Sequence, residues 1–208
     1  MELLFMSFGA LISVINPLGT LPIFISLMKD KERKEINETA IRTVLNVFVI
    51  MIIAFFLGQY VLGFFSISLE ALKITGGLII TSSGFALLSG KFTKHKGMRH
   101  KEKADARSRS DVSLTPLALP MLSGPGSISL LITYNQTLKS NLEWLTIIGA
   151  ILLTCFATLM LLLSARIIVR SLGASGINAL SRIVGFIVIA IGVQYIISAL
   201  FVLVAQLK

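Results

Sequence analysis

Proline and glycine interrupt two apolar stretches of this chain, and the interruptions hold the residues best suited to bind a ligand. The stretches, residues 3–28 and 112–138, carry no charged side chain. A proline has no N–H, and its ring clashes with the carbonyl four positions earlier, so each motif predicts a break in a helix. In a membrane such a break frees backbone groups that hydrocarbon cannot satisfy, which is typical of a transporter's binding site. The motifs read Ile15-Asn16-Pro17-Leu18-Gly19-Thr20-Leu21-Pro22 and Pro120-Met121-Leu122-Ser123-Gly124-Pro125-Gly126-Ser127.

The backbone N–H groups that follow each proline form the predicted anion-binding part of this site. A helix N-terminus carries unpaired N–H groups and a partial positive charge, which attract a carboxylate. The freed carbonyls of Ser13 and Met121 have the opposite polarity and could hold an ammonium group or a cation. A small zwitterion uses both kinds of group, with Asn16 and Ser123 setting its orientation. The predicted substrate-binding residues are Asn16, Pro17, Leu18, Gly19, Thr20, Ser123, Gly124, Pro125, Gly126 and Ser127.

A structural alternative is that these prolines only kink packed helices, which membrane proteins tolerate. One proline alone would favour that alternative. Two dense motifs at related positions favour a site.

The positions of the titratable side chains argue against catalysis. All ten Asp and Glu residues lie in predicted loops or at predicted helix ends, and His95 and His100 lie in a basic stretch. A proton-coupled pump usually carries an acid or histidine within the membrane. No nucleophile constellation or metal-ligand cluster is visible. We therefore predict that the protein is not an enzyme and has no metal site or cofactor, while coupling to Na⁺ through neutral oxygens stays open.

Composition indicates a membrane protein. Of the 208 residues, 55% are hydrophobic and 14% are charged, against about 25% charged in a soluble domain. A membrane-spanning helix needs about 20 residues, with a range of roughly 17–25. The predicted fold is an all-α membrane protein of six transmembrane helices, of which the first and fourth are broken. The six segments are residues 3–28, 43–69, 74–90, 112–138, 144–165 and 183–207.

The basic residues follow a positional rule that explains the net charge of +9 without a nucleic-acid partner. Most lie in residues 29–42, 91–111 and 166–182, three predicted loops on one side of a six-helix bundle. Because loops rich in Lys and Arg stay in the cytoplasm, these loops are predicted to be cytoplasmic and both termini extracytoplasmic. Anionic lipid headgroups are a second predicted partner of these loops.

The two halves of the chain resemble each other. A constant shift that places Pro17 on Pro125 also places Gly77 on Gly185 and Gly84 on Gly192. Since each half has three helices, the second half enters from the opposite side, which gives a 3+3 inverted-topology repeat. Residues 1–208 thus form one membrane domain, in which repeats 1–90 and 112–208 are joined by the basic segment 91–111.

Small residues at helical spacing predict how the helices pack. Gly77 and Gly84 lie two turns apart and share a face, as do Gly185 and Gly192, so both pairs favour close helix contacts. Cys155 is the single cysteine. A thiol-redox carrier needs a cysteine pair, so that function is disfavoured.

The motifs resemble those of the MarC family of bacterial inner-membrane proteins. Gly76-Gly77 also fits the family's pattern, as do residues 181–186 together with Gly192-Val193-Gln194-Tyr195. The resemblance implies a carrier of small neutral amino acids such as glycine and alanine, within the LysE-like group of 3+3 inverted-repeat proteins. The residues that carry the likeness are Asn16-Pro17-Leu18-Gly19-Thr20-Leu21-Pro22 and Pro116-Leu117-Ala118-Leu119-Pro120 followed by Gly124-Pro125-Gly126.

The predicted function is secondary transport of small neutral amino acids, or similar small zwitterions, by alternating access. The alternative is a non-transporting membrane protein that assembles with partners through its glycine-rich helices. The sequence leaves the substrate, the direction of transport, the coupling ion and the oligomeric state open.

Overall fold

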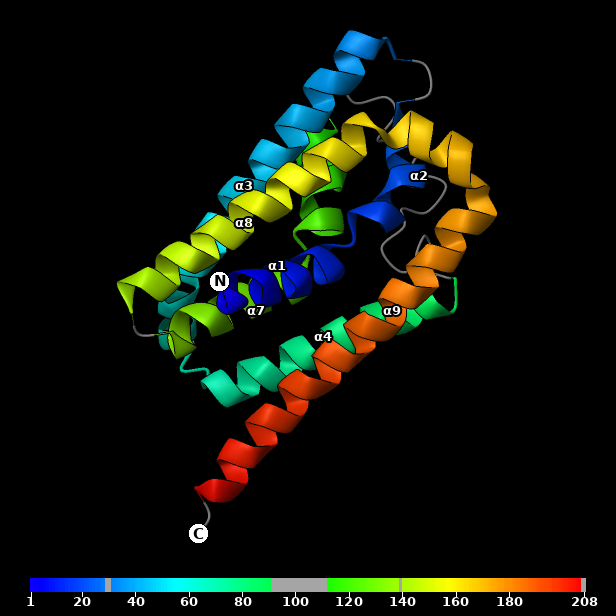
Figure 1. The fold of residues 1–208 in the computed structure, drawn as a ribbon. Coiled ribbons are helices and arrows are strands. Elements are labelled where there is room, and N and C mark those ends of the chain that lie inside the picture. The colour runs from blue at the N-terminus through cyan, green and yellow to red at the C-terminus, as the bar shows by residue number, and fades with distance from the viewer. Residues whose placement is uncertain (29–30, 91–111, 139, 207–208) are drawn as a thin grey trace.

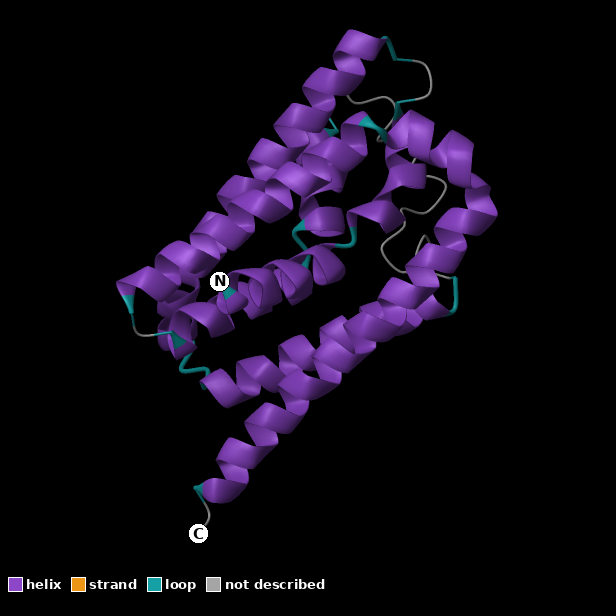
Figure 2. Cartoon of the chain, in the orientation of Figure 1, coloured by secondary structure: helices purple, strands orange, loops and turns teal. Residues whose placement is uncertain are grey.

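The computed structural model describes residues 1–28, 31–90, 112–138 and 140–206. Figure 2 shows helices joined by loops, and the described residues contain no strand, which confirms the all-α prediction. In chain order (Figure 1) the elements are α1 (Glu2–Ile15), α2 (Pro17–Leu27), α3 (Arg33–Phe64), α4 (Leu69–Leu88), η1 (Ser113–Leu122), α7 (Pro125–Thr137), α8 (Asn141–Leu163) and α9 (Ala165–Ala205). The predicted basic linker, residues 91–111, lies outside the described residues.

Four helices are long and apolar enough to cross a membrane: α3, α4, α8 and the Ser175–Ala205 part of α9. The pair α1 and α2, bent by 41°, gives a fifth span if it crosses as one broken segment. The predicted fourth helix is divided between η1 and α7. The described residues therefore support four or five spans, and the count of six stays a prediction.

Two of the predicted basic loops are largely helical, which corrects the sequence analysis. Helix α3 begins at Arg33, where Glu32 and Glu35 form a capping box. Most of the predicted loop 29–42 is therefore the first part of α3. Residues 166–182 belong to α9, which starts directly after Ser164 and changes direction at Gly173. The loops were misplaced because charged residues mark where the apolar segment ends, whereas a helix continues as long as its backbone bonds are made.

Gly173 has the one backbone conformation in α9 that requires glycine. Its φ of 62° and ψ of 178° lie in a region that side chains with a Cβ avoid. The chain turns here from a short basic arm into the long apolar helix Ser175–Ala205.

Helices α4 and α9 lie side by side along much of their lengths (Figure 1) and pack closely. A Cβ added at Gly77 would lie 2.6 Å from the carbonyl oxygen of Gly192, and one added at Gly84 would lie 2.8 Å from that of Gly185. Only glycine allows two helix backbones to approach so closely. The predicted packing role of these four glycines is confirmed.

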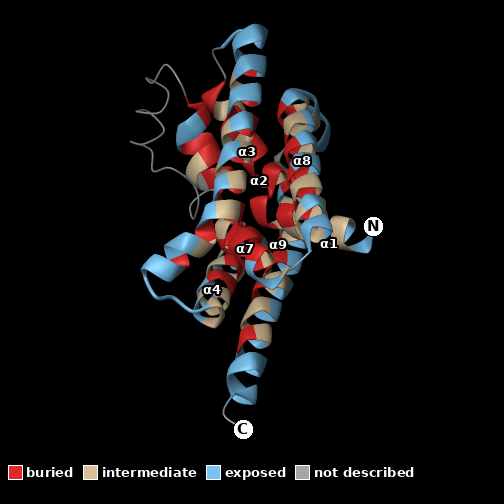
Figure 3. Ribbon diagram, turned by 90° about the vertical axis from the view of Figure 1, so that its left-hand side faces the viewer, coloured by how far each residue is buried: buried red, intermediate tan, exposed pale blue. Residues whose placement is uncertain are grey.

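Several polar side chains are buried with the apolar core, and many large apolar side chains are exposed, as expected of a chain whose solvent is lipid. Buried residues concentrate in the middle of the bundle, around α2 and α7, while the outer turns of α3 and α8 are exposed (Figure 3). The exposed stripe on α3 has one apolar residue per turn: Leu45, Val49, Ile53 and Leu57. The buried polar side chains include Asn16, Thr20, Ser123, Ser127, Thr133 and Asn135.

Candidate functional site

The first break is made by Asn16. Helix α1 ends at Ile15, and Asn16 adopts the left-handed conformation with φ 47° and ψ 66° while its N–H donates to the Ile12 carbonyl at 2.9 Å. Asparagine tolerates this conformation better than most residues. Pro17 then occupies the first position of α2, where its missing N–H costs nothing. The chain therefore ends one helix and begins another, instead of kinking one helix at Pro17.

The side chain of Asn16 caps the helix that it starts. Its Oδ1 accepts a hydrogen bond from the Gly19 N–H at 3.3 Å, and the Thr20 hydroxyl donates to the Asn16 carbonyl at 3.4 Å. One of the predicted anion-binding N–H groups, that of Gly19, is thus already paired. The Nδ2 of Asn16 has no hydrogen-bond partner in the described residues, and the residue is only 2% exposed. A buried donor without a partner is costly, so a ligand acceptor here would be stabilising.

The second break is longer than predicted. Within η1 the backbone is extended at Thr115 and Leu119, each of which precedes a proline. The ring of a following proline pushes a residue out of the helical region. The Ser123 N–H then donates to the Ala118 carbonyl, five residues back, at 2.8 Å. The interruption therefore extends from η1 through Gly124, whereas the predicted interruption covered residues 120–127.

Helix α7 begins at Pro125 without a side-chain cap. The Ser127 hydroxyl donates to the Gly124 carbonyl at 2.9 Å, and the Ile128 N–H donates to the same carbonyl at 3.2 Å. No side chain in the described residues therefore caps the N–H groups of the first turn. Within the described part of the chain the Ser123 hydroxyl also has no partner, and the residue is 1% exposed. These groups are the polar counterpart of Asn16 at the second break.

The two breaks are neighbours in the fold. A Cβ added at Gly126 would lie 3.4 Å from Cγ1 of Val14 and 2.9 Å from Cγ1 of Ile80. The first turn of α7 therefore packs against the last turn of α1, and η1 also contacts α2. Of the ten predicted site residues, Pro125 is exposed and Leu18 is half-buried, while the other eight are buried. The structure brings the segments together, and their binding of a ligand stays a prediction.

Asn135, in the last part of α7, is a buried polar residue that the sequence analysis missed. It is 4% exposed, and neither its Nδ2 nor its Oδ1 has a partner in the described residues. It lies more than two turns beyond the break, so the proline and glycine pattern gave no reason to select it. The available signal was that an asparagine is unusual within an uncharged apolar segment.

A cavity of about 460 Å³ lies elsewhere, between the end of α2, the start of α3, the end of α8 and the start of α9. None of the ten predicted site residues lines it. Phe24 in its wall is one helical turn beyond Thr20, so the cavity lies next to the half-helix that follows the first break.

Comparison with known proteins identifies the chain. The model of the MarC family of integral membrane proteins matches residues 1–204. The chain belongs to the MarC family. The resemblance read from its two proline motifs is thereby confirmed, and the protein is an integral membrane protein.

Curated MarC relatives match along nearly their whole length. A membrane protein of Aquifex aeolicus is 33% identical over 93% of this chain and 90% of its own. The membrane protein YhcE of Escherichia coli is 32% identical over 94% of this chain and 91% of its own length. The inner membrane protein MarC of Citrobacter koseri is 32% identical over 90% of this chain and 89% of its own length. These names give a membrane location and no substrate. No solved structure matches this chain.

Proposed function

We propose that this MarC family protein is a secondary transporter that binds small neutral amino acids, or similar small zwitterions, where its two helix breaks meet. The observation that carries the proposal is the contact between Gly126 and Val14, which joins the breaks, together with the buried, unpartnered polar groups of Asn16 and Ser123. Such groups are costly in an empty protein interior and become favourable when a polar ligand pairs with them.

The polarity of the breaks fits a zwitterion. Helices α2 and α7 both begin there, so two partial positive charges and their first N–H groups favour a carboxylate. Helix α1 ends there, and the carbonyls of its last turn favour an ammonium group. Asn16 offers Nδ2 as a donor, and the Ser123 hydroxyl can donate or accept.

We propose that the chain is a 3+3 inverted repeat, and that alternating access occurs as one bundle of its helices rocks or slides around the site. The glycine contacts support this arrangement, because Gly77 meets Gly192 while Gly84 meets Gly185. If Gly77 corresponds to Gly185 and Gly84 to Gly192, this crosswise pairing is what a two-fold axis produces. The packing of α1 on α8 and of η1 on α3 follows the same exchange, as does that of α3 on α7 and of α2 on α8.

The proposed orientation places the start of α3 and the start of α9 in the cytoplasm and both termini outside, in a bacterial inner membrane. Arg33 and Arg166 support it, because these residues from two separate basic segments line the same cavity and therefore lie at the same end of the bundle. Basic residues gathered at one end are typical of the cytoplasmic side.

The alternative, a non-transporting protein that assembles with partners, had the glycine faces as its sequence basis. Those faces are used within the chain, between α4 and α9. The transporter proposal therefore has the stronger support.

Flux measurements in proteoliposomes test the proposal. Radiolabelled glycine and alanine should enter or leave vesicles that contain the protein, with and without a Na⁺ gradient, and each should raise the melting temperature of the protein in detergent. Ser123→Ala should lose flux, while the matched control Ser171→Ala, an exposed position on α9, should keep it. Absent flux and absent thermal shifts across the neutral amino acids would refute the proposal and favour the assembly role.

A further inference from the structure

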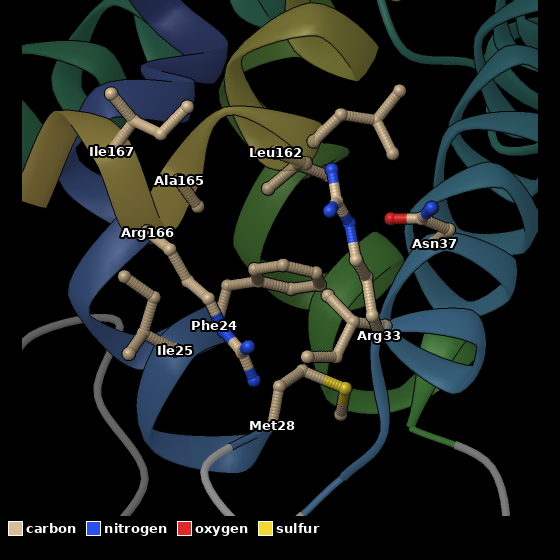
Figure 4. A pocket seen from close by; sticks show the side chains of 11 residues that line it. Phe24, Ile25, Met28, Arg33, Asn37, Leu162, Ala165, Arg166 and Ile167 are labelled. Carbon is tan, nitrogen blue, oxygen red and sulfur yellow. The ribbon is translucent and has the colours of Figure 1, made fainter.

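The cavity between α2, α3, α8 and α9 has an arginine on two of its walls. Arg33 comes from the first turn of α3 and Arg166 from the first turn of α9, and Figure 4 shows both side chains extending into the space between the helices. The polar side chain of Asn37 lies one turn beyond Arg33. The eleven lining residues include no acid.

Neither arginine has a carboxylate partner in the described residues. Arg33 has no ion pair or hydrogen bond there, and Arg166 donates from Nη2 to the Lys31 carbonyl at 3.5 Å, the limit for a hydrogen bond. The nearby acid Glu35 is occupied, because it pairs with the Lys31 ammonium at 3.0 Å and accepts the Glu32 N–H at 3.1 Å. Two guanidinium groups are therefore available to an anion that enters the cavity.

The ends of α2 and α8 and the starts of α3 and α9 meet at this cavity, so the opposite partial charges of these helix ends offset one another and the two guanidinium groups carry its positive charge. A guanidinium group binds phosphate oxygens through paired hydrogen bonds, which makes two arginines on one cavity a fitting phosphate site.

The remaining walls of the cavity are apolar. They are formed by side chains at the end of α2, the end of α8 and the start of α9, and Phe24 and Leu162 are almost fully buried. An anion with an apolar tail would fill both parts of the cavity, whereas a free anion would leave the apolar part empty. The apolar lining includes Phe24, Ile25, Met28, Leu162, Leu163 and Ile167.

We propose that this cavity binds a phosphate ester, and specifically the headgroup of an anionic phospholipid, with Arg33 and Arg166 on the phosphate and part of an acyl chain against the apolar walls. Basic pockets between transmembrane helices at the cytoplasmic side suit such headgroups. The site shares no residue with the proposed substrate site, so it goes beyond the transport function and can be tested separately.

The test measures lipid retention by the full-length protein in detergent. Native mass spectrometry and thermal shift are recorded with phosphatidylglycerol, with zwitterionic phosphatidylcholine, with glycerol phosphate and with inorganic phosphate. We expect retention of phosphatidylglycerol and a melting temperature that rises with it, and no comparable effect of the other three probes.

The decisive variant is Arg33→Ala with Arg166→Ala, matched by Lys34→Ala with Arg170→Ala. The control removes the same charge from exposed positions on the same two helices that do not line the cavity. Affinity for phosphatidylglycerol should fall by about tenfold or more in the first double variant, as expected when charge-assisted hydrogen bonds are lost, and by much less in the control. The melting temperatures of both lipid-free variants check that each is folded.

Three results would overturn the inference. Equal losses in the two double variants would mean non-specific attraction by the basic end of the bundle. Equal binding of phosphatidylcholine would mean that the cavity does not select the headgroup charge. Tight binding of glycerol phosphate or inorganic phosphate alone would assign the site to a soluble phosphate compound instead of a lipid.

Discussion

Adding one methyl group at Gly192 should separate α4 from α9. The Cβ of an alanine there would lie 2.6 Å from the Gly77 carbonyl oxygen and 2.7 Å from the Thr81 backbone nitrogen, where ordinary contacts begin at 3.4 Å. Both neighbours are backbone atoms of α4, so no side-chain rotation relieves the overlap, and the helices must move apart by most of an ångström. Overpacking of this kind costs about 1–3 kcal/mol, and we expect Gly192→Ala to lower stability by that order.

Gly185→Ala should have a similar effect, because its Cβ would lie 2.9 Å from the Gly84 carbonyl oxygen on the same helix pair. Gly9→Ala is the matched control. Gly9 lies inside α1 with nothing within 4 Å of an added Cβ, and the same exchange in a helix interior stabilises by roughly 0.5–1 kcal/mol. The two interface variants and the control should therefore change stability in opposite directions.

Thermal unfolding of the purified variants in one detergent measures these effects, with helix content from circular dichroism as a check on folding. If Gly192→Ala and Gly185→Ala melted at or above the temperature of Gly9→Ala, the close contact between α4 and α9 would be wrong, and with it the support for a two-fold arrangement.

Three further predictions concern single residues. Asn16→Ala should lower stability by more than the roughly 1 kcal/mol of the lost α2 cap, because alanine also tolerates the left-handed conformation of residue 16 less well. It should also remove the thermal shift given by substrate, whereas the exposed Asn178→Ala should do neither. Gly173→Ala should lower the melting temperature, because a φ of 62° with a ψ of 178° costs a residue with a Cβ about 1–3 kcal/mol; an unchanged value would mean that the bend in α9 relaxes freely. Cys155 is buried on α8 and should react with a maleimide dye only as the protein melts, so fast labelling of the native protein would contradict its position.

The sequence predicted most of the elements that carry the candidate site. Hydrophobic length located the helices, and proline with glycine located both interruptions, because these signals depend on local chemistry. The glycine spacing on α4 and α9 also identified the closest helix contact correctly.

Local sequence signals did not predict which residues end the helices at each break. Pro17 was expected to break a helix and to start a half-helix, and α2 does begin there; the proline rule did not identify Asn16 as the residue that ends α1 and caps α2. At the second break, Thr115 and Leu119 leave the helical region because each precedes a proline, and this enlarged the interruption. The basic segments at the starts of α3 and α9 were predicted to be loops. Charged residues indicate where the membrane ends, but a helix can continue beyond that boundary.

The cavity lined by Arg33 and Arg166 could not be predicted from the sequence. Its walls come from four helices whose ends meet only in the folded chain, and none of the residues is unusual where it stands. The basic segments were expected to attract anionic lipids, but the pairing of these two arginines depends on tertiary packing.

Each helix makes its principal contacts with helices of the opposite half, and this has a consequence for the order of assembly during synthesis. The glycine face of α4 meets no partner until α9, which ends the chain, has entered the membrane. Helix α4 is also the least apolar of the four candidate spans, with a mean hydropathy of 1.5 against 2.4 or more for the others. Until α9 is inserted, the glycine face of α4 leaves backbone and hydroxyl groups without their helix partner. Truncation before α9 should therefore give a product that cellular quality control degrades.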